Sequence, residues 1–493
     1  MVGIDGTVVQ VEAAVGGGLP RTVLVGLPDA SLYEARDRCK AAVSASGGPW
    51  PDRLLTINLS PATLPKSGSH YDLAIVAAIM AAQGLVTGDF TTRAVLLGEL
   101  GLSGAVRRAS GLLPALQAAR AAGFTTAVVP AEQLAEAALV EGLQLFGVDS
   151  LAELMAVLKG GPGAAARPVP RPVVVNPEAP DFAEVSGQEE ARWALEVAAA
   201  GRHHVLLQGP PGVGKTMLAS RLPSILPPLT HSEALEVASI QSLHGNRVDG
   251  ISHVPPFADP HRGASLVSMI GGGSRTLRPG QISLAHRGVL FLDEAPEFPT
   301  RVLESLRTPL ESGEVMIARA EARARFPARF QLVMAANPCP CGHWGAVQQE
   351  CRCAPYTVRR YQERLSGPML DRIDIHQTLF QQPPRVMRKR AEGEPSAAIL
   401  ARVMEARQRQ ARRLAATPWT TNAEVPGPAL RDLPIPQGVE ILERSLRNGQ
   451  LSPRGVDKVW RLAWSVADLA GSDRITKSHL AQALGMRTDQ AAA

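Results

Sequence analysis

Apolar and polar positions repeat along the chain with two different periods. Short runs of branched apolar residues bounded by glycine, proline or serine predict β-strands, at residues 7–15, 21–27 and 54–60. Longer stretches of apolar and small residues predict helices, at residues 71–84 and 111–123. Strand-like and helix-like stretches alternate again from residue 181 to about residue 380, and the pattern beyond residue 395 is helical. A multidomain α/β protein is therefore expected.

Two stretches rich in proline and glycine divide this pattern into units. Such stretches neither sustain a helix nor donate a full ladder of hydrogen bonds, so they indicate linkers. At roughly 150 residues per domain, 493 residues are expected to form about three units. The expected order is an N-terminal domain, a linker, an α/β core, a second linker, a helical lid and a disordered tail, at residues 1–159, 160–180, 181–380, 381–395, 396–485 and 486–493.

Composition narrows the class of protein without identifying it. Apolar content of 45% and charged content of 20% are those of an ordinary globular protein. We find no run of 18 apolar residues and no charged-then-apolar leader, so a cytoplasmic protein without a membrane partner is expected. The net charge of +5 favours a polyanionic partner. Seven lysines against 44 arginines are also explained by genome base composition, so charge alone leaves nucleic-acid binding open.

The sequence GPPGVGKT at residues 209–216 fits the phosphate-binding pattern G-x-x-x-x-G-K-[ST]. It lies between an apolar run and a helix-like stretch, which is the strand–loop–helix context that phosphate binding requires. Lys215 is expected to reach the β- and γ-phosphates of ATP, and Thr216 to bind Mg²⁺. The expected nucleotide-binding residues of the loop are Gly209, Pro210, Pro211, Gly212, Val213, Gly214, Lys215, Thr216 and Met217.

Two further apolar runs end in polar residues suited to ATP hydrolysis. VLFLDE at residues 289–294 predicts a buried strand of the Walker B type. Its Asp293 would hold Mg²⁺ through water, and Glu294 would polarise the attacking water as a general base. QLVMAANP at residues 331–338 predicts another strand, after which Asn337 would orient the same water as a sensor 1 residue.

Two arginines are candidates for stabilising charge during hydrolysis. Arg372 lies between two aspartates, where it would either form surface salt bridges or act as an arginine finger in a neighbouring subunit. Arg454 lies in the first turn of an amphipathic helix, where the helix dipole disfavours a cation. Arg454 is therefore either a simple surface charge or a sensor 2 residue that reaches the γ-phosphate from a helical lid.

Together these motifs resemble the magnesium-chelatase-like AAA+ proteins of the ComM/YifB family. Residues 187–229, 282–298 and 336–342 carry the resemblance, which covers nearly the whole chain. It implies an AAA+ ATPase of the helix-2-insert clade, in which the ring is usually a hexamer and Gln188 lies near the adenine. ComM-type proteins promote branch migration during natural transformation, so the resemblance also implies a DNA helicase or translocase that acts in homologous recombination.

Two segments are candidate DNA contacts. Residues 258–288 lie between the Walker motifs and resemble the helix-2 insert, with turn signals flanking Arg275 and Arg278. Residues 314–330 resemble the presensor-1 hairpin. A period of two would place Arg319, Arg323 and Arg325 on one face with Val315 and Ile317. These arginines would track phosphates without reading bases, or would form only a solvated charged face.

Four of the five cysteines form two C-x-C pairs, Cys339/Cys341 and Cys351/Cys353. Four thiolates can close a tetrahedral zinc site that orders a loop, although the usual spacing is C-x₂-C. His343 is a further candidate ligand. Reduced structural thiols and redox chemistry remain open as alternatives.

The N-terminal 159 residues resemble the proteolytic domain of Lon, which has a ribosomal-S5-like fold. Lon chemistry needs a serine nucleophile and a lysine, but the matching positions hold His70 and Leu113. A binding or assembly domain without peptidase activity is therefore expected. Family members usually carry about ten more residues before the motif that starts here at residue 2, so an edge strand is expected to lie unpaired.

Three functions remain open from the sequence. The first is a hexameric, ATP- and Mg²⁺-dependent motor that moves single-stranded or branched DNA. The second is a chelatase-type motor that remodels a protein partner inserting Mg²⁺ into a tetrapyrrole. The third is an ATP-gated scaffold that binds nucleic acid without unwinding it. The Lon-like domain and the cysteine pairs favour the first, because chelatase motor subunits lack that combination.

Overall fold

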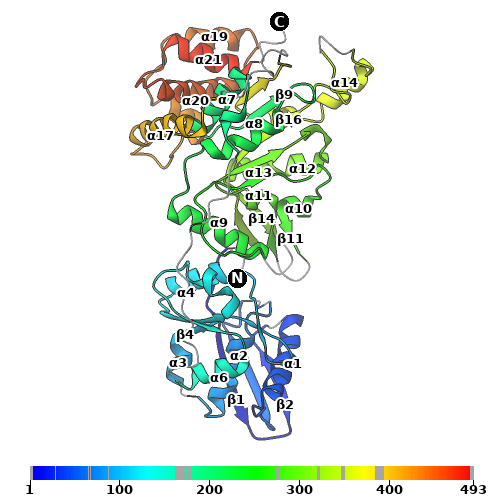
Figure 1. Ribbon diagram of the computed structural model, residues 1–493, viewed down its shortest axis with the longest axis vertical. Coiled ribbons are helices and arrows are strands. Elements are labelled where there is room, and N and C mark those ends of the chain that lie inside the picture. The colour runs from blue at the N-terminus through cyan, green and yellow to red at the C-terminus, as the bar shows by residue number, and fades with distance from the viewer. Residues whose placement is uncertain are drawn as a thin grey trace.

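The computed structural model describes residues 4–27, 29–64, 66, 68–86, 88–160, 174, 180–273, 277–318, 323–345, 350–382 and 393–488. Most of both expected linkers, residues 489–493 of the expected tail, and the candidate DNA contacts Arg275 and Arg319 lie outside these described residues. The molecule is elongated, with an N-terminal unit at one end and C-terminal helices at the other (Figure 1).

The N-terminal unit contains two small sheets. β1 (Gln10–Gly16) and β2 (Arg21–Val25) flank β3 (Leu54–Ser60), to which β1 is antiparallel and β2 parallel. Alternate residues of β3 are buried, because they face the core formed with α1 (Ala30–Ala45) and α2 (Asp72–Ala82). The second sheet is parallel, in the order β4 (Ala94–Leu96), β7 (Thr126–Pro130) and β8 (Gln144–Val148). The other elements are α3 (Gly88–Arg93), β5 (Glu99–Leu100), β6 (Val106–Arg107), α4 (Leu112–Ala121), α5 (Leu134–Ala137) and α6 (Leu151–Leu158).

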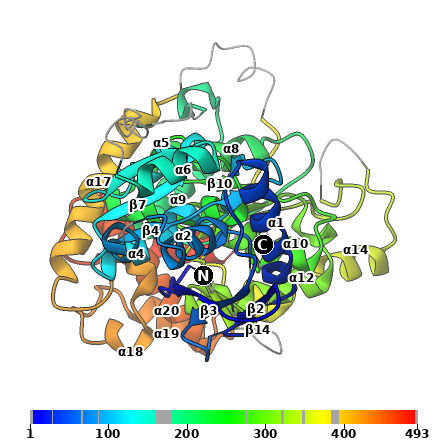
Figure 2. The same cartoon turned by 90° about the horizontal axis from the view of Figure 1, so that it is seen from below.

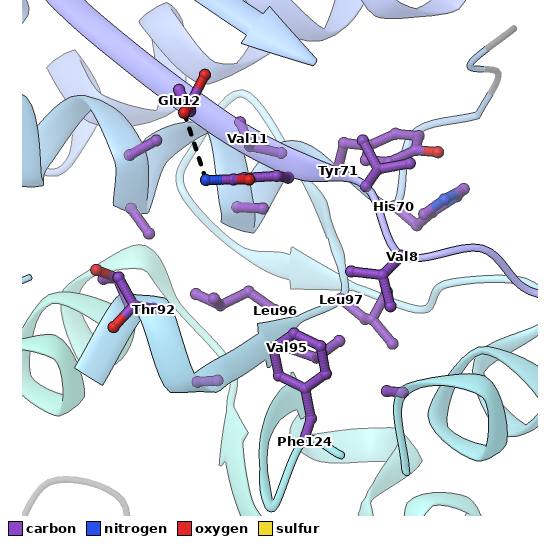
Figure 3. A pocket seen from close by; sticks show the side chains of 18 of the residues that line it. Val8, Val11, Glu12, His70, Tyr71, Thr92, Val95, Leu96, Leu97 and Phe124 are labelled. Atoms are coloured by element: carbon purple, nitrogen blue, oxygen red, sulfur yellow. Dashed lines mark hydrogen bonds between the residues drawn. The ribbon is translucent and has the colours of Figure 1, made fainter. Parts of the chain in front are cut away.

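An apolar pocket of about 560 Å³ lies in this unit (Figure 3). Val11 of β1 and Val95 and Leu96 of β4 line it together with alanines of α2 and α4. Both β1 and β4 lie at an edge of their sheet. Two strand edges therefore border one apolar pocket.

The central unit is built on a parallel five-stranded sheet in the order β10-β13-β16-β9-β17. In that order the strands are Phe257–Ala258, Val289–Leu292, Gln331–Ala336, Val205–Gln208 and Ile375–Thr378. β13 and β16 are buried at every residue, as expected of strands that are apolar throughout except for Gln331 at the start of β16. The expected α/β fold is therefore confirmed. Its helices are α7 (Glu189–Gly201), α8 (Lys215–Arg221), α9 (His231–His244), α10 (Leu266–Ile270), α11 (Gln281–Leu284), α12 (Thr300–Ser305), α13 (Arg307–Ser312), α14 (Pro355–Gln362) and α15 (Gly367–Leu370).

Two hairpins extend from the central unit. β11 (Gly271–Gly272) pairs with β12 (Arg278–Pro279), and β14 (Glu314–Ala318) pairs with β15 (Arg323–Pro327), both antiparallel. The predicted hairpin over residues 314–330 is thus confirmed, but its predicted faces are wrong. Val315 and Phe326 lie opposite one another and are buried, whereas Arg323 and Arg325 share the exposed face with Met316. The prediction continued a single alternation of faces through both strands. In the structure, odd-numbered residues of β14 pair with even-numbered residues of β15, so the two strands bury residues of opposite parity.

The C-terminal unit consists of α17 (Ser396–Arg413), α18 (Gly427–Leu430), α19 (Glu440–Arg447), α20 (Pro453–Leu469) and α21 (Lys477–Arg487). Polar side chains of α17 bind the C-terminal end of α7, where the Arg407 guanidinium donates to the Ala199 carbonyl and Gln410 Nε2 to the Ala200 carbonyl. These bonds satisfy carbonyls that have no partner within α7. Within the described residues, no helix is both long and apolar enough to cross a membrane.

Helix α9 joins the central unit to the N-terminal unit. Leu112 and Leu116 of α4 share one apolar cluster with Ala234 and Ala238 of α9. Ser242, near the end of α9, donates its hydroxyl to Glu136 Oε1 at 2.5 Å, and its carbonyl accepts the Gly111 N–H at 3.1 Å. A segment from between the two Walker motifs therefore forms part of the N-terminal unit's packing.

Replacing Leu116 by alanine is expected to lower the free energy of unfolding by about 2–5 kcal/mol, because it leaves a cavity at a fully buried position beside α9. Thermal denaturation followed by circular dichroism measures the loss. Leu19→Ala is the matched control, since Leu19 is 87% exposed and its truncation should shift the midpoint little. Equal midpoints for the two variants would contradict the packing of α4 against α9.

Candidate ATP-binding site

The loop of residues 209–216 connects the end of β9 to the start of α8. Gly212 and Gly214 have φ of +80° and +95°, which residues with a Cβ rarely adopt. At Gly209 an added Cβ would lie 2.6 Å from the Leu379 carbonyl oxygen, so close packing also requires glycine there. Because the loop ends where α8 begins, unpaired backbone N–H groups are available to phosphate oxygens.

Lys215 is buried, and its ammonium group is folded against the loop. Nζ donates to the carbonyls of Gly209 (2.6 Å) and Pro210 (2.9 Å) and to Asn337 Oδ1 (2.9 Å). Burial lowers the pKa of Lys215, and the charges of Asp293 and Glu294 oppose that shift. The structure thus brings Lys215 and Asn337 into direct contact, although they are far apart in sequence.

Thr216 and Asp293 form the next contact of the site. Thr216 Oγ1 donates to Asp293 Oδ2 at 2.8 Å, and Asp293 Oδ1 accepts the backbone N–H of Glu294 at 2.9 Å. A hydroxyl beside a carboxylate is an oxygen donor set that suits Mg²⁺. Asp259, which follows β10, was not expected here. Burial, together with the charge of Asp293, raises the pKa of Asp259, so the two carboxylates interact electrostatically.

Glu294 lies at the end of the Walker B segment in a left-handed backbone conformation, with φ of +50°. Its carboxylate is ion-paired with Arg262, which lies in the segment between α9 and α10. Both side chains are about half exposed, at 55% for Arg262 and 42% for Glu294. No local pattern in the sequence singles out Arg262, because its contact with Glu294 depends on the tertiary position of the segment between β10 and α10.

The remaining candidates lie around this group. Gln188 Nε2 donates to the carbonyls of Val213 (3.2 Å) and Phe380 (2.8 Å), so it connects the loop to the segment after β17. Arg372 is ion-paired with Glu311, and Arg454, which is 78% exposed, lies 3.6 Å from Asp371. Within the described part of the chain, neither arginine bonds to the group formed by residues 215, 216, 293 and 337.

The four clustered cysteines come together in space. All four Sγ atoms lie within 4.8 Å of one another. Cys339 Sγ is 3.3 Å from Cys341 Sγ and 3.7 Å from Cys351 Sγ, and Cys353 completes the set. Zinc–sulfur bonds of about 2.3 Å in a tetrahedron separate the sulfurs by roughly 3.8 Å, so this cluster could hold a metal ion. Backbone N–H groups of His343 and Arg352 lower the pKa of Cys341 to about 6, which favours a thiolate ligand.

Three of the five candidate DNA-contacting arginines are described. Arg278 lies on β12, and Arg323 and Arg325 lie on β15, all exposed. Arg325 is 3.8 Å from Glu314 on the paired strand.

The two positions that match the Lon catalytic residues have other roles in the structure. His70 lines the apolar pocket (Figure 3). Leu113 is buried, and its N–H donates to Ser242 Oγ of α9 at 3.4 Å.

Replacing Arg262 by alanine is expected to raise ATP hydrolysis by roughly 1.5- to 5-fold, which is what loss of one exposed ion pair can release. The variant frees a Glu294 oxygen that the guanidinium otherwise engages. Steady-state phosphate release measures the rate. Arg247→Ala is the control, since Arg247 forms an exposed pair with Asp249 outside the site, at 72% and 57% exposure. A rate for Arg262→Ala at or below that of Arg247→Ala would contradict this prediction.

Comparison with known proteins gives family matches along most of the chain. Three families match successive parts of the chain: "Subunit ChlI of Mg-chelatase" at residues 11–133, "Magnesium chelatase, subunit ChlI" at 181–386, and its C-terminal family at 393–487.

Three relatives match over almost their full length. An uncharacterized protein of Mycobacterium tuberculosis is 48% identical over 489 residues, covering 98% of this chain and 96% of its own. YifB of Escherichia coli is 41% identical over 490 residues, with coverages of 99% and 95%. Competence protein ComM of Haemophilus influenzae is 37% identical over 494 residues, with coverages of 99% and 96%. The chain therefore belongs to the ComM/YifB family of magnesium-chelatase-like AAA+ ATPases.

Proposed function

We propose that this protein is an ATP-driven motor that moves along DNA as a ring, has no peptidase activity, and promotes branch migration in recombination and natural transformation.

 The observation that carries the proposal is the group formed by Lys215 with Asn337 and by Thr216 with Asp293 at one edge of a parallel sheet. When bound, ATP would supply the phosphoryl group whose transfer to water drives the motor, and Mg²⁺ would neutralise charge on the phosphate oxygens. The donor set described above fits both.

Each residue of this group has a proposed role. The loop N–H groups and Lys215 bind the phosphates, and Thr216 and Asp293 hold Mg²⁺. Glu294 accepts a proton from the attacking water, and Asn337 orients that water. Gln188, which bonds to Val213 of the loop, borders the adenine.

We propose that the working site is shared between subunits of a hexamer. In the single chain Arg372 is paired with Glu311 and does not reach the Lys215 group, which is the behaviour expected of a finger that acts on a neighbour. Arg454 lies at the start of α20 beside Asp371 and would reach the γ-phosphate as sensor 2 after a movement of the lid. The rate per chain is therefore expected to rise with protein concentration as rings form.

DNA is the proposed substrate of the motor. One relative is named as a competence protein, and Arg278, Arg323 and Arg325 present exposed cations on two hairpins. We assign these hairpins to the helix-2 insert and the presensor-1 hairpin, with the boundaries expected from the sequence. The N-terminal unit is an S5-like domain without peptidase activity that serves assembly or binding, and a DNA motor of this kind would act in the cytoplasm.

A second candidate is a chelatase-type motor, because all three matching families are described as magnesium chelatase subunits. Such a motor would remodel a protein partner. A nucleic-acid-binding scaffold, the third alternative, would bind DNA without moving it. The experiment below separates the three.

Branched-DNA unwinding with ATP is expected for the wild-type protein and is expected to be lost in Lys215→Ala and Glu294→Gln. Lys215→Ala removes the phosphate-binding cation, and Glu294→Gln removes the proton acceptor, so hydrolysis should fall by at least about 100-fold in both. Strand separation on a gel and phosphate release measure the two activities. Arg247→Ala, which lies outside the site, is the control.

The outcomes distinguish the candidates. If the wild-type protein hydrolyses ATP but binds no DNA even at low salt, the proposed DNA motor fails and a protein client is favoured. If DNA is bound but never unwound or displaced, the scaffold is favoured. For a DNA motor the affinity should fall steeply with salt, because phosphate contacts release counterions.

The cysteine cluster is proposed to hold one structural Zn²⁺. Metal analysis of the purified protein is expected to give about one zinc per chain, and Cys351→Ser should lower that value and the thermal midpoint. Cys39→Ala is the control, since Cys39 is buried in the N-terminal unit away from the cluster. A zinc content near zero in the wild-type protein would contradict the proposal.

A further inference from the structure

A small lobe projects from the central unit at the four cysteines. We define the cysteine lobe as residues 338–345 and 350–364, which include α14. Because the four sulfurs lie within 4.8 Å of one another, the cluster ties the two segments of the lobe together. α14 lies at the periphery of the molecule, on the side opposite to α17 of the C-terminal unit (Figures 1 and 2).

Two of the four exposed aromatic side chains in the described part of the chain lie in this lobe. The chain has ten Phe, six Trp and four Tyr, and only four of these side chains are exposed: Tyr33, Trp344, Tyr356 and Phe380. Trp344 is 45% exposed and follows Cys341 by three residues, and Tyr356 is 71% exposed and follows Cys353 by three. The Trp344 N–H donates to Cys339 Sγ at 3.4 Å, so the cluster fixes its backbone.

Arginines surround these aromatic residues. Arg352, Arg359 and Arg360 are all exposed. The Arg360 guanidinium lies 5.6 Å from the centre of the Tyr356 ring, so it covers one face of that ring. Arg359 is paired with Glu363 at 2.8 Å, which leaves Arg352 and Arg360 as the cations closest in sequence to the two aromatic residues.

We propose that the cysteine lobe is a binding surface for single-stranded nucleic acid, with bases stacked on Trp344 and Tyr356 and phosphates held by Arg352 and Arg360. Exposed aromatic rings next to arginines are the combination that binds single strands without sequence preference, because every base has a π-face and every nucleotide has a phosphate. The inference rests on the proposed DNA motor and assigns part of its strand-binding surface.

The lobe also contacts the ATP-binding loop. A Cβ added at Gly342 would lie 2.4 Å from Pro211 Cδ, so the backbone between Cys341 and His343 packs directly on the loop. Gln362 Nε2 of α14 donates to the Pro338 carbonyl at 3.1 Å, and Pro338 follows Asn337. A nucleic-acid strand bound to the lobe could therefore shift Pro211 and Asn337 through these two contacts. Such binding should stimulate ATP hydrolysis.

Fluorescence anisotropy of labelled oligothymidylate with the full-length protein tests the inference. Trp344→Ala and Tyr356→Ala are each expected to weaken binding on the order of tenfold, as loss of one stacked base does. Tyr33→Ala is the control, because Tyr33 is 48% exposed, close to Trp344 at 45%, but lies on α1. Arg352→Gln with Arg360→Gln should flatten the dependence of log affinity on log salt by about 0.7 for each arginine.

Two further measurements exclude a purely structural effect. The variants should keep the basal rate of ATP hydrolysis while losing its stimulation by oligothymidylate. Tryptophan emission should be quenched by the oligonucleotide, and Trp344→Phe should lose that quenching while retaining most of the affinity.

The results overturn the inference in three distinguishable ways. If the wild-type protein binds oligothymidylate and the lobe variants bind it equally well, only the assignment of this surface is wrong. If the variants break the ring, the exposed aromatic residues form a subunit interface instead. If the wild-type protein binds neither oligothymidylate nor branched DNA, the proposed DNA motor fails as well.

Discussion

The register of three parallel strands determines whether this protein can hold ATP. Strands β9, β16 and β13 lie side by side, with Ala336 paired to Gln208 and Leu292 to Met334. Their carboxyl ends therefore reach one edge of the sheet together, and the residues that follow them meet there. This is why Lys215 bonds to Asn337 and Thr216 to Asp293. A shift of any one strand would separate a phosphate-binding group from its partner.

The packing around this sheet links the ATP site to both ends of the molecule. One apolar cluster contains residues of the central sheet together with Trp464 and other residues of the C-terminal helices. The central and C-terminal units therefore share one hydrophobic core. Another contains residues of α4 and α9. Glu236 of α9 is also bonded to His286 and Arg287, just before β13. Movement of the C-terminal helices or of the N-terminal unit would therefore be expected to shift strands of the central sheet that position the ATP-binding residues.

Three contacts of the expected site residues join parts of the chain that are distant in sequence. Arg262 engages Glu294, Glu311 engages Arg372, and Gly342 packs on Pro211. Arg262 lies in the segment between the Walker motifs and Glu311 lies on α13, and no local pattern singles out either residue. Exposed ion pairs of this type are weak, so binding of nucleotide, DNA or a second subunit has enough energy to exchange them.

The sequence alone determined the chemistry and most of the elements. Local patterns identify the glycine-rich loop, the apolar runs ending in Asp293 and Asn337, and the two cysteine pairs. They can be recognised from the sequence because backbone preference and burial restrict which residues such segments contain. The faces of the β14–β15 hairpin were predicted wrongly, because parity across a hairpin depends on pairing between strands. Tertiary structure alone decided that Arg262 meets Glu294, that α9 packs on the N-terminal unit, and that the cysteine lobe rests on the ATP-binding loop. Such contacts join residues distant in sequence, and only the packed chain brings them together.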